Sequence, residues 1–213
     1  MPLRPPVGLA RLLALGAVWL AACARKDGGQ YTVGFSQMES NNPWRLAQTA
    51  SLKAEAAKRG YQLVVTDAQG QTAKQVSDVE DLIARRVKVI LLAPREFQGL
   101  APALAAAKRA NIPVILVDRE AAGTPGQDYV TFLGSNFVEQ GKRAAEWLAK
   151  TTNGTATVVE LTGTPGSSVA ADRARGFREE LAKHPGMRVV ASQTGDFSRA
   201  QGQSVMQNLA QSL

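Results

Sequence analysis

The stretch Pro113-Val114-Ile115-Leu116-Val117-Asp118-Arg119 decides the fold of this chain. An unbroken row of aliphatic residues is typical of a strand that is buried on both faces, because a half-exposed strand alternates polar and apolar residues. Strands of this kind lie in parallel sheets that helices cover on both sides. The polar pair that follows directly lies at the carboxyl end of the strand, where ligands bind in open parallel sheets.

The same pattern of an apolar run followed by a helical stretch repeats from Tyr31 onward. Helical stretches show apolar residues at helical spacing, as at Val76, Val79 and Ile83. We predict strands over 31–35, 62–66, 89–92, 114–117, 129–133, 155–161 and 188–192. We predict helices over 44–59, 73–86, 100–110, 137–150, 169–183 and 199–209. The alternation predicts an α/β fold built on parallel sheets.

Several local signals agree with these helix ends. Thr72-x-x-Gln75 and Ser198-x-x-Gln201 match the capping box, and Asn136-x-x-Glu139 is a plausible analogue. Gly60 and Gly154 follow helices at positions that need a positive φ.

A domain boundary is expected near 133–136, because four βα units precede the strand there and a new series follows. We therefore expect an N-terminal lobe over 31–133 and a C-terminal lobe over 134–213. The second series stops inside a helix, so we expect the C-terminal lobe to be incomplete.

The first 22 residues have the features of an export leader. Arg4 and Arg11 are the only charges there, and the apolar run 12–20 is too short to span a bilayer as a helix. The run leads into Leu20-Ala21-Ala22-Cys23, which resembles the bacterial lipoprotein box and contains the only cysteine. We expect 1–22 to be a lipoprotein signal peptide, Cys23 to carry lipid and 23–30 to form a polar tether. An ordinary signal peptide beside an unrelated cysteine is the alternative.

Composition argues against several classes of protein. The formal charge of +7 comes from 25 basic and 18 acidic residues, which are interleaved and form no basic stripe with aromatics, so we expect no nucleic-acid partner. The sequence has no metal-ligand spacing, no nucleophile elbow and no P-loop lysine. His184 precedes Pro185 at a predicted helix end and is interpreted as a surface residue. We therefore expect no metal, no cofactor and no enzymatic activity, and contact with a membrane only through the lipid.

Binding signals follow two of the predicted strands. Trp44-Arg45 suits a sugar, because an indole stacks on the apolar face of a sugar ring and a guanidinium donates to hydroxyls. Asp118-Arg119 combines an acceptor and a donor for neighbouring hydroxyls. Each signal has another explanation, since Trp44 can be a core residue and Asp118-Arg119 a surface ion pair.

In series, the motifs resemble one family. They are Asn41-Asn-Pro-Trp-Arg45, Asp118-Arg119, Asp172-Arg173-x-x-Gly-Phe177 and Gly195-Asp-Phe197. The resemblance is to the ribose-type, or type I, periplasmic sugar-binding proteins of ABC transporters, over about 31–209. Gly34-Phe-Ser-Gln37 and Trp44-Arg45 are most similar to the galactofuranose-binding branch, whereas Asn41-Asn-Pro43 departs from it.

The resemblance implies two doubly wound parallel-sheet domains joined by a hinge, with a monosaccharide held between them. The residues it implies as sugar contacts are Asn41, Trp44, Arg45, Asp118, Arg119, Arg173 and Phe197. Ser36, Gln37 and Asn136 are further candidates.

The function implied is that of an exported, lipid-anchored substrate-binding protein, in the periplasm or on the outer face of the cytoplasmic membrane. It would capture a hexose or pentose, with galactofuranose as one candidate, for an ABC permease and its ATPase. A sensory or chemotaxis binding protein of the same fold is the alternative. Because the family continues beyond the point matched by Leu213, we expect a C-terminally truncated chain that binds sugar very weakly or not at all.

Overall fold

The computed structural model describes residues 31–212. The predicted signal peptide over 1–22, the lipidated Cys23 and the tether over 23–30 lie outside the described residues.

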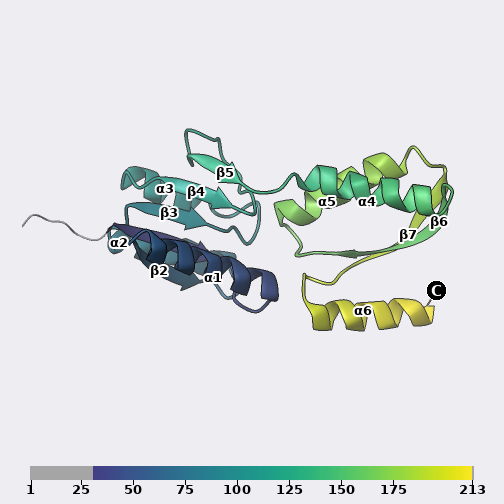
Figure 1. The fold of residues 1–213 in the computed structure, drawn as a ribbon, viewed down its shortest axis with the longest axis horizontal. Coiled ribbons are helices and arrows are strands. Elements are labelled where there is room, and N and C mark those ends of the chain that lie inside the picture. The colour runs from purple at the N-terminus through teal and green to yellow at the C-terminus, as the bar shows by residue number, and fades with distance from the viewer. Residues whose placement is uncertain (1–30, 213) are drawn as a thin grey trace, which may run out of the picture. The chain divides into compact units, whose positions relative to one another are not determined.

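The first lobe is formed by five strands and three helices. They are β1 (Thr32–Gln37), α1 (Pro43–Lys58), β2 (Gln62–Asp67), α2 (Thr72–Ala84), β3 (Val89–Leu92), α3 (Ala101–Arg109), β4 (Val114–Val117) and β5 (Thr131–Leu133). All the strands are parallel, in the order β2-β1-β3-β4-β5. The strand order reverses direction at β1, which places α1 on one face and α2 and α3 together on the other (Figure 1).

The core of this lobe lies between the sheet and the α2–α3 layer. Leu82 from α2, Leu104 from α3 and the aliphatic residues of β3 and β4 are buried together there. Ile90, Leu92 and Leu116 have no exposed surface and lie on the face of the sheet that α2 and α3 cover, whereas Leu91 and Ile115, on the other face, are partly buried. Because the strands are mostly apolar, polar groups are concentrated in the loops that follow them.

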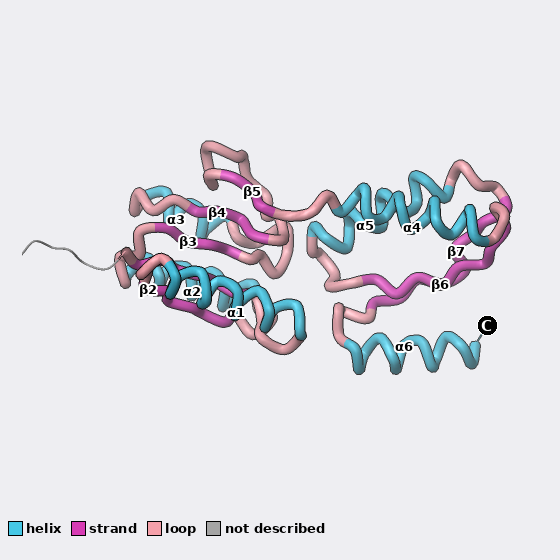
Figure 2. The backbone as a smooth tube through the Cα atoms, in the orientation of Figure 1, coloured by secondary structure: helices cyan, strands magenta, loops and turns pink. Residues whose placement is uncertain are grey.

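The second lobe is formed by α4 (Phe137–Thr151), β6 (Thr155–Thr162), α5 (Ser168–Leu181), β7 (Gly186–Thr194) and α6 (Arg199–Ser212). β6 and β7 are parallel, with one register irregularity between Val158 and Val159. Figure 1 shows α4 and α5 on one face of these strands and α6 on the other. Within the described residues the chain passes between the lobes through the segment after β5 (Figure 2).

Helices α4 and α5 meet at a very close contact. A Cβ on Gly141 would lie 2.0 Å from the carbonyl oxygen of Arg173, so the backbones can approach this closely only because Gly141 has no side chain. This contact fixes where α5 presents the side chain of Arg173.

The structure contains every strand and helix that the sequence predicts, with shifted ends. β5 is shorter than predicted and begins at Thr131, whereas β7 is longer and extends over Gly186–Thr194. The positive φ angles predicted for Gly60 and Gly154 are confirmed at 70° and 75°.

The capping predictions had mixed outcomes. Asn136 accepts a hydrogen bond from the Glu139 N–H at 3.0 Å, which confirms it as the cap of α4. The capping box at Thr72 is wrong, because α2 has no side-chain cap and Gln75 instead bonds to the Ala93 carbonyl oxygen and the Arg95 N–H. Two buried backbone groups after β3 compete more strongly for this amide than the helix end does.

None of the helices in residues 31–212 has the length and apolar character that crossing a membrane requires.

Candidate functional site

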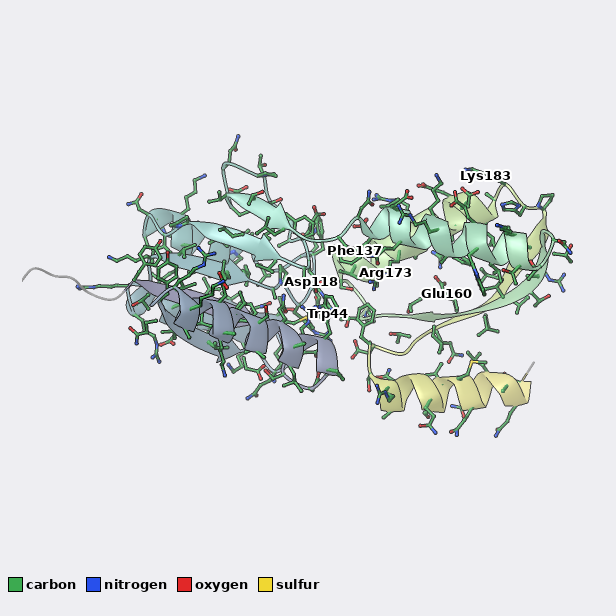
Figure 3. All side chains as sticks on the ribbon, viewed as in Figure 1. Trp44, Asp118, Phe137, Glu160, Arg173 and Lys183 are labelled. Atoms are coloured by element: carbon green, nitrogen blue, oxygen red, sulfur yellow. The ribbon has the colours of Figure 1, made fainter. Side chains whose placement is uncertain are left out.

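A cavity of about 440 Å³ is lined by both lobes. In the first lobe its lining comes from the start of α1 and from the segments that follow strands, and in the second it comes from α4, α5 and the segment after β7. The lining residues are Asn42, Pro43, Trp44, Arg45, Asp118, Arg119, Ser135, Phe137, Gln140, Val169, Arg173 and Phe197. Figure 3 labels four of them, Trp44, Asp118, Phe137 and Arg173, which gather in one region away from Lys183.

Arg45 and Asp118 form a buried ion pair at the floor of this cavity. The Arg45 Nη2 lies 2.7 Å from the Asp118 Oδ2, and the two side chains are 3% and 14% exposed. Arg45 also donates to the Gln48 Oε1 at 2.9 Å. Two of the guanidinium nitrogens are thus engaged, and this arrangement holds the carboxylate of Asp118, which itself lines the cavity.

Gln37 supports this pair from below. Its Nε2 donates to the Gln48 Oε1 at 3.0 Å and to the Thr49 Oγ1 at 3.2 Å, and its Oε1 accepts from the Met38 N–H at 3.0 Å. Gln37 has no exposed surface. The structure therefore places Gln37 under the site, where it fixes Gln48 and through it Arg45.

Arg119 presents a strongly desolvated guanidinium to the cavity. It is buried and donates from Nη1 to the Arg95 carbonyl oxygen at 2.9 Å. Among the described residues, nothing accepts a hydrogen bond from its buried Nε. Burial, and then the positive charge of Arg45, lower the pKa of Arg119 to about 10. A hydroxyl that accepts from this guanidinium would satisfy a donor that is otherwise unpaired.

Phe197 lies between two guanidinium groups. The Arg119 Cζ is 5.3 Å and the Arg173 Cζ 6.0 Å from the centre of its ring, within cation–π range. The ring packs on Gly163, where any Cβ would lie 1.9 Å from the Phe197 Cζ. The backbone of Phe197 has a φ of 53°, which turns the chain out of β7 and toward the cavity.

Arg173 reaches the cavity from α5 and is held by two residues of α4. Its Nε donates to the Gln140 Oε1 at 2.9 Å, and its Cζ lies 4.8 Å from the centre of the Phe137 ring. Burial lowers its pKa, and the charge of Asp118 opposes that effect.

Trp44 lies at the first turn of α1 and is 64% exposed, which excludes the core explanation. The start of α1 is fixed by Asn42, whose side chain accepts from the Arg45 N–H at 3.0 Å, and by Pro43. The indole therefore stands at the cavity with a free face.

The structure brings together six of the seven principal candidates, and it places the others nearby. Asn41 does not line this cavity, but it lines a neighbouring one, and the two cavities share Asn42, Pro43 and Phe197. Ser36 is fully buried beneath the site, and the Asn136 side chain caps α4.

Sequence reasoning missed the contribution of α4. Phe137 and Gln140 are one turn apart on this helix and hold Arg173, 33 residues later than Gln140. The sequence signal that could have identified Phe137 and Gln140 is their position in the first turn of α4, directly after the segment that passes between the lobes.

The described residues contain no cluster of histidine, cysteine and carboxylate groups that would hold a metal ion. The cavity offers hydrogen-bond donors, one carboxylate and three aromatic rings, which together suit a polyhydroxylated ring. Two α/β lobes with such a cavity lined by both define a binding protein of the type I periplasmic fold.

The chain belongs to the periplasmic binding protein domain family, whose family model matches residues 33–213. It is 40% identical to the galactofuranose-binding protein YtfQ of Escherichia coli over 199 residues, which is 93% of this chain and 63% of that protein. It is 38% identical to the ribose import binding protein RbsB of E. coli, over 94% of this chain and 65% of that protein. The chain thus spans less than two thirds of the length of these relatives.

Solved structures agree with this membership. The crystal structure of a galactofuranose binding protein superimposes with a TM-score of 0.82 at 40% identity, covering 85% of this chain and 62% of that one. A Caulobacter myo-inositol binding protein bound to myo-inositol gives 0.82 at 34% identity, covering 87% of this chain and 62% of that one. All of these similar proteins are named as binding proteins, and RbsB is named as an import binding protein.

Proposed function

We propose that this chain captures a monosaccharide as the substrate-binding component of a carbohydrate ABC importer. The observation that carries the proposal is the single cavity of about 440 Å³ in which six predicted sugar contacts from both lobes meet. The relatives named for galactofuranose and ribose binding support a hexose or pentose as the ligand class, with galactofuranose as one candidate.

Each group in the cavity has a role that suits a sugar. Trp44 offers a stacking face from the first lobe and Phe197 one from the second. Asp118 accepts hydrogen bonds from hydroxyls, and Arg119 and Arg173 donate to them. Arg45 contributes by holding Asp118 at 2.7 Å.

The proposed mechanism is closure of a lobe over 31–133 and a lobe over 134–213 on the ligand. A sugar that contacts both walls binds better when they are close together, so binding shifts the population toward the closed state. A permease and its ATPase are the proposed partners that respond to that state. Export and lipid attachment at Cys23 would place the chain in the periplasm or on the outer face of the cytoplasmic membrane.

Titration of the purified chain with D-galactose, L-arabinose, D-ribose and myo-inositol, followed by calorimetry and tryptophan fluorescence, tests the proposal. Because hydrogen-bond donors, a carboxylate and stacking rings from both lobes line the cavity, we expect a saturable response, and a weak one in line with the expectation from the sequence. Arg173→Ala should abolish it. Arg175→Ala is the matched control, because Arg175 lies on the same helix, pairs with Asp172 and does not line the cavity. Equal loss in both variants, or no saturable response to any of the four, would contradict the proposal.

A further inference from the structure

Three contacts outside the cavity join the lobes directly. The Phe97 N–H donates to the Gly166 carbonyl oxygen at 2.8 Å, and the Glu120 N–H donates to the Ser168 Oγ at 2.9 Å. Arg95 and Asp196 approach to 3.6 Å. These contacts lie in or next to the segments that follow strands in both lobes, and none of the six residues lines the sugar cavity.

Ser168 has a special position among them. It is the first residue of α5, the helix that carries Arg173, and it is only 7% exposed. Its partner, the Glu120 N–H, belongs to the residue directly after Arg119. One buried hydroxyl therefore connects the two segments that supply guanidinium groups to the cavity from opposite lobes.

The neighbouring serine has a separate task. The Ser167 Oγ donates to the Thr164 carbonyl oxygen at 2.8 Å and accepts from the Ala170 N–H at 3.3 Å, so it caps α5 within its own lobe. The helix end is thus satisfied without Ser168, and the Ser168 hydroxyl is left for the contact between lobes.

We propose that Ser168 is a positioning residue that holds the two walls of the cavity in register. Its hydroxyl fixes the backbone beside Arg119 relative to the helix that carries Arg173. This inference rests on the proposed function only for its effect on sugar binding, because the contact joins protein groups alone and forms in whatever fraction of the chains has the lobes close together, with or without a sugar.

Amide hydrogen exchange measured by NMR on the sugar-free chain tests the contact. In Ser168→Ala the Glu120 amide loses its acceptor, and we expect it to exchange roughly 3- to 10-fold faster. The Phe97 amide should accelerate by a similar factor, although its own partner Gly166 is unchanged, because both contacts depend on the same approach of the lobes. The Ala122 amide, which donates to the Phe97 carbonyl oxygen within the first lobe, should not change.

Two further variants separate positioning from a general structural role. Ser168→Thr keeps the hydroxyl and should restore protection of both amides, whereas Ser168→Cys, with a weak acceptor of similar size, should give intermediate rates even if the alanine variant folds poorly. Ser167→Ala, the matched control, should leave Glu120 and Phe97 protected.

The inference is overturned if Ser168→Ala accelerates Glu120 alone, because the hydroxyl would then merely satisfy one amide. It is also overturned if Ser167→Ala accelerates both amides as much. With D-galactose or L-arabinose present, Ser168→Ala should weaken binding and Ser168→Thr should restore it. A chain that binds no sugar but shows coupled exchange would contradict the proposed function while leaving the role of Ser168 in lobe contact intact.

Discussion

Replacing Asp118 with asparagine removes the charge that faces Arg45 while changing little else. Asparagine has the same size and tolerates the φ of 67° that Asp118 adopts, so the substitution adds no backbone strain to the loss of charge. The Arg45 guanidinium would stay 3% exposed without a counter-charge, retaining the bond to Gln48 at 2.9 Å.

Breaking a buried ion pair from one side costs about 3 to 5 kcal/mol, and the retained bond to Gln48 places this case at the low end, at about 3 kcal/mol. With a urea dependence of roughly 2 kcal/mol per molar, the unfolding midpoint followed by circular dichroism should fall by about 1.5 M. Adding Arg45→Met to Asp118→Asn removes the unpaired charge, and it should recover about 2 kcal/mol of the loss.

Asp172→Asn is the control, because its ion pair with Arg175 is much more exposed, at 25% and 59%, and should contribute less than about 1 kcal/mol. If the double variant is no more stable than Asp118→Asn, within ~0.5 kcal/mol, then Arg45 and Asp118 are not coupled and the account of the cavity floor fails.

Three further outcomes are expected. Arg119→Met should raise the free energy of unfolding by about 1 to 2 kcal/mol and abolish sugar binding. Burial lowers the pKa of Arg119 to about 10, and this shift reflects a cost of about 3 kcal/mol at neutral pH that the hydrogen bond of Arg119 only partly offsets. Urea unfolding and calorimetry measure the two effects, and a destabilised variant would contradict the pKa argument. Since the pKa in the folded chain is lower than in the unfolded chain, the unfolded chain binds more protons above about pH 10, so Arg119 makes stability rise with pH only in that range and adds no pH dependence near neutrality. Gly141→Ala should destabilise the chain by more than about 3 kcal/mol in thermal unfolding, because the new methyl group overlaps the Arg173 backbone; Gly202→Ala, which meets nothing within 4 Å, is its control, and equal stability of the two would refute the close contact. Gln75→Ala leaves two buried backbone groups after β3 without partners and should cost about 2 to 4 kcal/mol in the same assay, whereas a cost below ~1 kcal/mol would show that water replaces the amide.

The order of strands and helices could be predicted because each strand is an apolar run and each helix has its own periodicity. The site could be predicted only in part. Asp118 follows a strand, Trp44 begins a helix and Arg173 lies in the second turn of one, and a parallel sheet brings strand ends and helix starts to one edge. The sequence does not reveal which charged side chains form ion pairs with one another in the folded protein. Arg45 is predicted as a sugar contact from the motif, and its ion pair with Asp118 depends on how the start of α1 lies beside the end of β4.

Gln75 illustrates the opposite error. Its spacing from Thr72 fits a helix cap, and only the folded sheet presents the backbone groups after β3 that take its amide instead. The contacts of Phe137 and Gln140 with Arg173 could not be predicted from the sequence either. They depend on the close packing of α4 against α5, which Gly141 permits.

The left-handed backbone at Asp118, Asp196 and Phe197 has a consequence for how this protein can change. Their φ angles of 67°, 49° and 53° disfavour most side chains and favour glycine. Glycine would relax the backbone at each position, but at Asp118 and Phe197 it would also delete a group that lines the cavity, and at Asp196 it would delete the carboxylate that approaches Arg95 from the other lobe. In a library of all single substitutions, selection for heat resistance should therefore favour glycine at these positions, whereas selection for ligand binding should favour the present side chains.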